Sequence, residues 1–82
     1  MILNVISAEY AGDYKVKLLF DDGVKKIVDL KDAIFNDRRA IFAPLKEKDF
    51  FKDFHVKFNT ITWENEADFA PEFLYEIGSV LK

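Results

Sequence analysis

The sequence contains no cysteine, a single histidine, two prolines and three widely separated glycines. Without cysteine, a disulfide framework and a thiolate metal site are both excluded. The glycines, at positions 12, 23 and 78, are too far apart to form a phosphate-binding loop, and the two serines lie in no nucleophile motif. These absences leave enzyme chemistry without visible residues to perform it. We therefore expect a protein that is not an enzyme and that has no cofactor or metal.

Long hydrophobic runs and an excess of positive charge are missing as well. Asn4, Ser7 and Glu9 interrupt the only early apolar stretch, and no run approaches the ~20 residues that a membrane-spanning helix needs. The formal net charge is −3, so the basic surface typical of nucleic-acid-binding domains is absent overall. Together with the lack of cysteine, this predicts a cytoplasmic protein without a secretory leader, without membrane contact and without direct contact with nucleic acid.

The chain is instead rich in apolar and aromatic side chains. Half of its 82 residues are hydrophobic, and nine are phenylalanine. A chain of this length buries roughly 60–65% of the surface that it exposes when unfolded, and each buried aromatic ring removes ~150–250 Å² from water. We expect a single α+β domain over residues 1–82, with a small aromatic core.

Alternation of apolar and polar residues predicts a central β-hairpin. Residues 14–20 and 24–30 are its expected strands, the second interrupted by Lys26, and Asp21-Asp22-Gly23 between them is a strong hairpin-turn signal. Four residues share the apolar face of the first strand: Tyr14, Val16, Leu18 and Phe20. Residues 2–8 predict an earlier strand. Its apolar residues on both faces indicate burial on both sides or an edge that a partner covers.

The middle of the chain predicts short segments. Residues 30–35 are expected to form a helical turn capped by Asp29, and residues 41–45 an extended apolar plug, because Pro44 disfavours a helical conformation at the preceding residue. A short helix is expected over residues 45–51.

Alternation resumes at residues 54–58, which predict a strand with Phe54, Val56 and Phe58 on one face. Residues 61–63 form either a second strand after a turn or the end of the same bent strand.

The C-terminal part predicts a loop over residues 64–70 and a helix over residues 71–81. Pro71 suits a first helical turn, and Glu72 suits the positive end of the helix dipole. A stripe at helical spacing is expected to bury this helix: Phe73, Leu74, Ile77, Val80 and Leu81. The predicted fold class is α+β: a small antiparallel sheet with a central β-hairpin, packed by a C-terminal helix and one or two short helices.

The densest cluster of acidic residues lies near the start of the C-terminal helix: Glu64, Glu66, Asp68 and Glu72. One interpretation is a solvated loop leading to a helix N-terminus, which favours negative charge and which Asp68 could cap. The other is a surface that a basic partner reads. Tyr75 belongs to the second interpretation, because tyrosine is common at interfaces, although packing at the core edge is the ordinary role of Tyr75 and of Trp63.

The remaining charged residues favour ordinary structural roles. His55 falls on the polar face of a strand with no second metal ligand beside it, and Asp21 and Asp22 suit a turn. The hairpin lysines either protect a sheet edge or, if they share one exposed face, bind an acidic ligand: Lys15, Lys17, Lys25 and Lys26. Lys31, Arg38 and Arg39 are only a weak indication of a phosphate-binding site.

Six segments of the chain together form a pattern in which their order and spacing matter. They are Phe20-Asp21-Asp22-Gly23, Val28-Asp29-Leu30, Phe42-Ala43-Pro44-Leu45, Phe50, Ile61-Thr62-Trp63-Glu64-Asn65 and the run from Ala67 to Tyr75. This pattern, from about Val5 to Tyr75, resembles the small bacterial family called domain of unknown function 2442. The family pattern commonly has Trp-Pro-Asn-Gly where this chain has Trp63-Glu64-Asn65-Glu66, so the loop here is more acidic. The resemblance implies a compact α+β domain with an antiparallel sheet, and it supplies no catalytic residues.

Three functional classes fit these observations. The leading hypothesis is a non-enzymatic protein-interaction module that covers a basic partner surface with loop 64–72. The resemblance further implies that such a module is the antitoxin-like member of a two-protein toxin–antitoxin system, because some relatives are encoded beside another small protein. The second hypothesis is a transcription-related module that self-associates through a sheet edge and contacts DNA with gathered basic residues. The third is a small-ligand binder, which needs a deep pocket.

Overall fold

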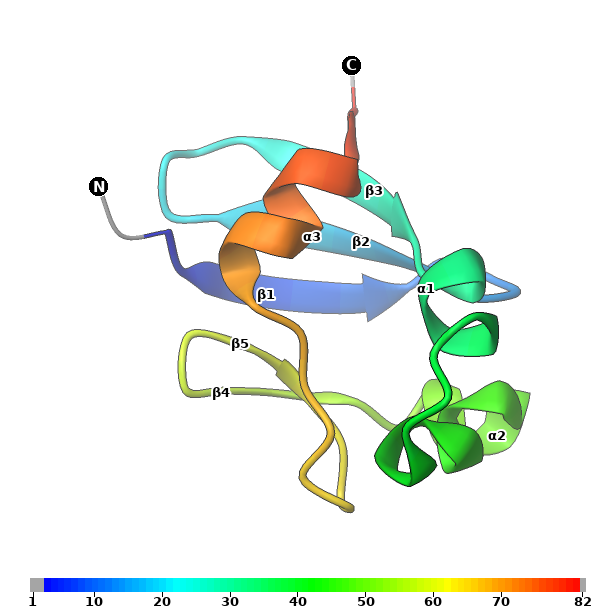
Figure 1. Cartoon of the computed structure of the whole chain (residues 1–82). Coiled ribbons are helices and arrows are strands. Elements are labelled where there is room, and N and C mark those ends of the chain that lie inside the picture. Colours follow the sequence, from blue (N-terminus) through cyan, green and yellow to red (C-terminus); the bar gives the residue numbers. More distant parts are fainter. Residues whose placement is uncertain (1–2, 82) are drawn as a thin grey trace.

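Two antiparallel sheets organise the chain in the computed structural model, which describes residues 3–81 (Figure 1). The larger sheet has the strand order β1-β2-β3-β6, and β4 pairs with β5 in a separate hairpin. The elements are β1 (Val5–Tyr10), β2 (Lys15–Phe20), β3 (Lys25–Asp29), α1 (Lys31–Phe35), the 3₁₀ helix η1 (Ala40–Lys46), α2 (Lys48–Phe51), β4 (His55–Lys57), β5 (Thr60–Thr62), α3 (Pro71–Ile77) and β6 (Ser79–Val80). The predicted α+β class is confirmed.

The β2–β3 hairpin follows the prediction closely. The amide of Phe20 donates to the carbonyl of Val24 at 3.0 Å, and Gly23 adopts a φ of 85°, which glycine takes without steric cost. Val16, Leu18 and Phe20 are buried on one face of β2. The first strand is Val5–Tyr10 rather than residues 2–8, of which residue 2 lies outside the described range.

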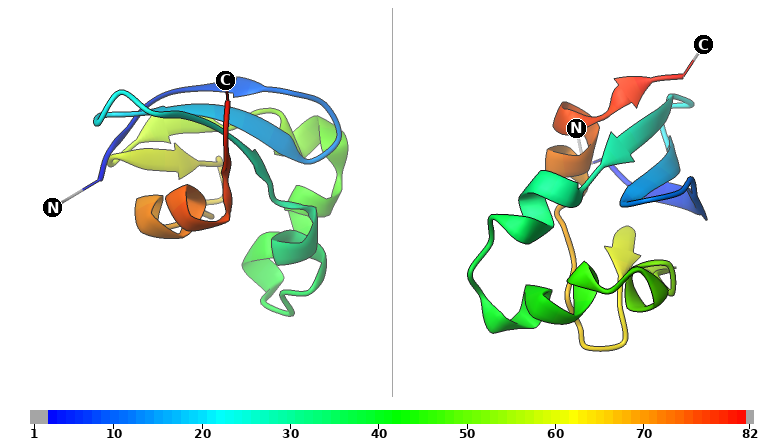
Figure 2. Two further views of the ribbon diagram at one scale, coloured as in Figure 1. Left: turned by 90° about the horizontal axis from the view of Figure 1, so that it is seen from above. Right: turned by 90° about the vertical axis from the view of Figure 1, so that its right-hand side faces the viewer.

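One face of the larger sheet is covered and the other is open. Figure 2 shows α3 and the β4–β5 hairpin on the same side of the curved sheet. The core between them contains Phe20, Phe51, Trp63 and Leu74. On the outer face, Lys17 and Lys25 are exposed. The described residues therefore form a layer of sheet, a hydrophobic core and a cover of short elements.

The segment expected to be an extended plug is instead the helix η1. The amide of Phe42 donates to the carbonyl of Arg39 at 3.1 Å, and that of Glu47 donates to the carbonyl of Pro44 at 3.1 Å. Residues three apart share a face of a 3₁₀ helix, so Phe42 and Leu45 are both buried. The prediction was wrong because the restriction that proline places on its neighbour is weaker than the burial of these two side chains. The following helix starts at Lys48 rather than at residue 45.

The β4–β5 hairpin turns earlier than expected. Phe58 and Asn59 form its two-residue turn with φ values of 53° and 71°, so two strands are present rather than one bent strand. The side chain of Phe58 is 87% exposed, whereas Ile61 is fully buried. The prediction that Phe58 shares the apolar face of Phe54 and Val56 was wrong, because the chain has left the strand at this residue.

The C-terminal helix α3 ends at Ile77, and the chain continues as β6 beside β3. A Cβ atom at Gly78 would lie 3.0 Å from the carbonyl oxygen of Leu74 and 3.0 Å from Cβ of Lys26. Glycine therefore lets the chain pass close to β3 and pair with it as β6. The amide of Leu81 then donates to the carbonyl of Lys25 at 2.9 Å. The predicted helix over residues 71–81 was wrong beyond residue 77.

Candidate interaction surface

The loop between β5 and α3 is held in a defined turn. The amide of Glu66 donates to the carbonyl of Trp63 at 2.9 Å, and the amide of Trp63 donates to the carbonyl of Ala67 at 3.0 Å. The side chain of Asn65 donates to the carbonyl of Ile41 at 2.7 Å, which ties the loop to η1. The indole of Trp63 is buried and donates to the carbonyl of Phe51 at 2.7 Å, as expected for a core residue. The loop is therefore a fixed support for the carboxylates that it carries.

Glu66 occupies the strained position of this turn. Its φ is 69°, in the left-handed region that a residue with a Cβ atom rarely adopts. A type I turn followed by one left-handed residue is a common hairpin connection, and glycine is its usual occupant at that residue. The family pattern described above commonly has glycine here. In this chain the left-handed position carries a carboxylate.

Three of the predicted acidic residues gather around one depression of about 440 Å³. We call it the polar depression, and it is lined by His55, Lys57, Phe58, Thr62, Trp63, Glu64, Glu66 and Asp68. Oε1 of Glu64 lies 3.0 Å from Nε2 of His55 across it. The exposed position predicted for His55 is therefore observed, with Glu64 as its neighbour.

The other two predicted surface residues lie elsewhere. Glu72 is exposed in the first turn of α3, and the hydroxyl of Tyr75 donates to Asp22 at 2.8 Å beside the hairpin turn. This hydrogen bond to a carboxylate raises the pKa of Tyr75. Asp68 does not cap α3, since Ala70 is the N-cap residue and no side chain caps this end.

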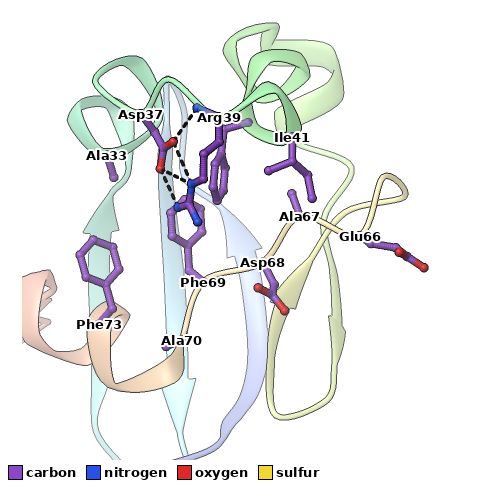
Figure 3. Close-up of a pocket in the computed structure, with 11 residues that line it drawn as sticks. Ala33, Asp37, Arg39, Ile41, Glu66, Ala67, Asp68, Phe69, Ala70 and Phe73 are labelled. Carbon is purple, nitrogen blue, oxygen red and sulfur yellow. Dashed lines mark hydrogen bonds and ion pairs between the residues drawn. The ribbon is translucent and has the colours of Figure 1, made fainter.

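A second depression, of about 550 Å³, borders the same loop (Figure 3). Its walls include Ile41, Phe69 and Phe73, and Glu66 and Asp68 line it as they line the polar depression. At its rim, Nη2 of Arg39 lies 2.7 Å from Oδ2 of Asp37. Hydrogen bonding to Arg39 lowers the pKa of Asp37, and the same contact raises the pKa of Arg39.

The open face of the sheet carries three of the four hairpin lysines, Lys15, Lys17 and Lys25. In the β2–β3 register Lys15 lies opposite Asp29, and in the β1–β2 register Lys17 lies opposite Glu9, so acidic residues offset these two lysines. Lys26 points to the covered face. Its Nζ donates to the carbonyl of Tyr75 at 2.5 Å and lies 3.8 Å from the centroid of the Tyr75 ring.

The described part of the chain contains neither a metal-binding cluster nor a membrane-spanning helix. Among residues 3–81, no three histidine, aspartate or glutamate side chains are grouped so that they could hold a metal ion. In the same part of the chain, no helix has the length and apolar character needed to cross a lipid bilayer. The candidate interaction surface therefore consists of the two depressions that border the acidic loop.

A family model described as "Protein of unknown function (DUF2442)" matches residues 5–78. The chain belongs to this family. The match confirms the resemblance seen in the sequence and extends it through Gly78, the C-cap residue of α3. The chain matches no curated protein and no solved structure. The family description assigns no activity to a DUF2442 domain.

Proposed function

We propose that this DUF2442 domain is a non-enzymatic protein-interaction module that covers a basic surface of a protein partner. The observation that carries the proposal is the placement of strained residues. Among residues 3–81, four residues other than glycine have positive φ values: Asp13, Phe58, Asn59 and Glu66. Aspartate and asparagine adopt this conformation several times more often than other residues with a Cβ atom, so Phe58 and Glu66 are the unusual members of this set. Phe58 and Glu66 both line the polar depression.

The energetics support a role for these two residues beyond folding. A left-handed conformation costs a residue with a Cβ atom roughly 1–2 kcal/mol, and such strain is concentrated at functional sites. In addition, a phenylalanine that is 87% exposed gains little from the hydrophobic effect in the isolated domain. A partner that buries this ring and pairs with Glu64, Glu66 and Asp68 gives both features a function.

The finer proposal is that the domain is the antitoxin-like member of a two-protein toxin–antitoxin system in the cytoplasm. Its support is the resemblance to relatives that are encoded beside another small protein, together with the acidic loop. In this role, the loop over residues 64–72 and Phe58 cover the partner's basic surface. The alternative DNA-contacting role has less support, because acidic residues lie opposite Lys15 and Lys17 and because Lys26 is buried.

Co-expression with the protein encoded next to this chain tests the proposal. We expect a stoichiometric complex on size-exclusion chromatography, with dissociation constants at least about tenfold larger for Phe58→Ser and Glu66→Ala, which is about 1.4 kcal/mol each. Phe35→Ser is the control, because Phe35 is also exposed but lines neither depression. Failure to form a complex contradicts the interaction role, and a complex that tolerates both substitutions contradicts the surface.

A further inference from the structure

An apolar groove continues from the second depression along α3. The depression in Figure 3 shares Ala33 and Phe73 with a neighbouring one of about 390 Å³, which Ile77 also lines. The groove therefore runs from Ile41 on η1, past Phe73, to Ile77 at the end of α3. We use the term α3 groove for these two joined depressions.

The floor of the α3 groove is an unpaired apolar helix face. Phe73 and Ile77 are one helical turn apart and are 38% and 39% exposed, and Ile41 across the groove is 40% exposed. The Phe73 ring stacks on Phe69 with a centroid distance of 5.8 Å and an interplanar angle of 17°, which holds it in place. An exposed apolar floor of this kind is what an amphipathic helix contacts when it lays its own apolar face into a groove.

The rim of the α3 groove is strongly acidic. Its lining contains five carboxylates and one guanidinium: Asp29, Asp32, Asp37, Glu66, Asp68 and Arg39. The guanidinium is already paired with Asp37 at 2.7 Å. The charge that the groove presents to an incoming molecule is therefore negative.

This charge selects among the possible occupants. Nucleic acid and anionic lipid carry the same sign as the rim, and a symmetric contact between two copies of this chain would place the same carboxylates against each other. A polypeptide with apolar residues on one side and lysine or arginine on the other matches both the floor and the rim.

We propose that the α3 groove binds an amphipathic helical segment of a protein partner, with apolar residues facing Phe73 and Ile77 and basic residues facing the rim. This proposal rests on the proposed interaction role and specifies the chemistry of the segment that the partner supplies. Glu66 and Asp68 border both depressions, so one partner can contact the polar depression and the α3 groove together. A 14-residue helix is ~21 Å long and fits a molecule whose principal extents are 32 × 24 × 19 Å.

A synthetic peptide tests the proposal directly. The probe is a helical 14-residue peptide with leucine on one face and lysine on the other, and its controls are a scrambled peptide of equal composition and a version with glutamate in place of lysine. In a titration followed by amide chemical shifts, we expect changes centred on Ile41, Phe73 and Ile77. Affinity should be at least about tenfold higher than for the scrambled peptide and should fall as salt is raised. Equal affinity for the scrambled peptide, or binding of the glutamate version, overturns the proposal.

Substitutions on two elements locate the site. Ile77→Ser on α3 and Ile41→Ser on η1 should each weaken binding of the leucine–lysine peptide about tenfold, and Ile6→Ser, at an exposed position in β1, should not. Unchanged binding by both groove variants overturns the proposal. Shifts confined to Phe58 and Glu64 also overturn the groove assignment, but they support the interaction role proposed for the polar depression. The failure of one proposal is therefore distinguishable from the failure of the other.

Discussion

Replacing Glu66 tests whether this chain gives up stability to keep a carboxylate in its loop. Glu66 has a φ of 69°, so its backbone is strained and its side chain lines both depressions. Glu66→Gly removes the strain and the charge, whereas Glu66→Ala removes the charge and keeps the strain. The difference in the free energy of unfolding between the two variants therefore reports the backbone effect without the effect of the charge.

The expected difference follows from two opposing effects. The left-handed conformation costs alanine about 1–2 kcal/mol and glycine almost nothing. Glycine in turn gives the unfolded chain more freedom, which costs the folded state about 0.4–1 kcal/mol. Glu66→Gly should thus be more stable than Glu66→Ala by about 0.5–1 kcal/mol, with a Tm about 3–6 °C higher for a domain of this size.

Fluorescence of the single tryptophan provides the assay, because Trp63 is buried next to the loop and becomes exposed on unfolding. Gly23→Ala is the converse control. Gly23 has a φ of 85° and no atom within 4 Å of an added Cβ, so this substitution introduces strain without a clash and should be destabilising by a similar amount. Partner binding should weaken equally in both Glu66 variants, since both lack the carboxylate.

Two results would refute this reasoning. If Glu66→Ala is as stable as Glu66→Gly, the left-handed conformation carries no cost at this turn. If Glu66→Gly gains stability and binds the partner as well as the unaltered protein, the carboxylate is not the reason that the strain is retained.

Three other predictions concern the contacts between α3 and the hairpin. Gly78→Ala should lower the free energy of unfolding by about 1–2 kcal/mol, because its Cβ would lie 3.0 Å from the carbonyl oxygen of Leu74; an unchanged urea midpoint would contradict this. Lys26→Met should lower the free energy of unfolding by about 1–2 kcal/mol in the same urea titration, because it removes the hydrogen bond to the Tyr75 carbonyl and the contact with the Tyr75 ring. An unchanged free energy of unfolding would show that these contacts only offset the cost of removing the lysine ammonium group from water. The raised pKa of Tyr75 means that its contact with Asp22 stabilises the fold below about pH 10 and that this contribution is lost as the pH rises through the folded-state pKa. A ring ¹³C titration should therefore have a midpoint above about 10, and Asp22→Asn should lower it; a midpoint that Asp22→Asn leaves unchanged would exclude Asp22 as the cause.

Local signals in the sequence accounted for part of the candidate site. The clustering of Glu64, Glu66 and Asp68 around one depression agrees with their proximity in the sequence, and a loop of few residues keeps such neighbours together. Phe58 was missed because period-two alternation continued through it, although the following Asn59 is a residue that favours a left-handed turn. The expected role of Tyr75 in this surface depended on the frequency of tyrosine at interfaces, and the fold places its hydroxyl 2.8 Å from a carboxylate oxygen of Asp22.

The sequence by itself determined the β2–β3 hairpin, because side-chain alternation and the Asp-Gly turn act between residues that are close along the chain. It also determined that a helix begins at Pro71, where proline suits the first turn. Only the tertiary structure decided where that helix ends and which side of it is buried. Gly78 leaves the helical conformation, with φ −73° and ψ 153°, and the chain then pairs with β3 as β6. A Cβ atom at Gly78 would lie 3.0 Å from Cβ of Lys26 and from Cγ2 of Val28, so this close approach to the sheet favours glycine. The same packing buries Leu74 and leaves Phe73 and Ile77 at the surface, because one short helix can turn only part of its apolar stripe towards the sheet.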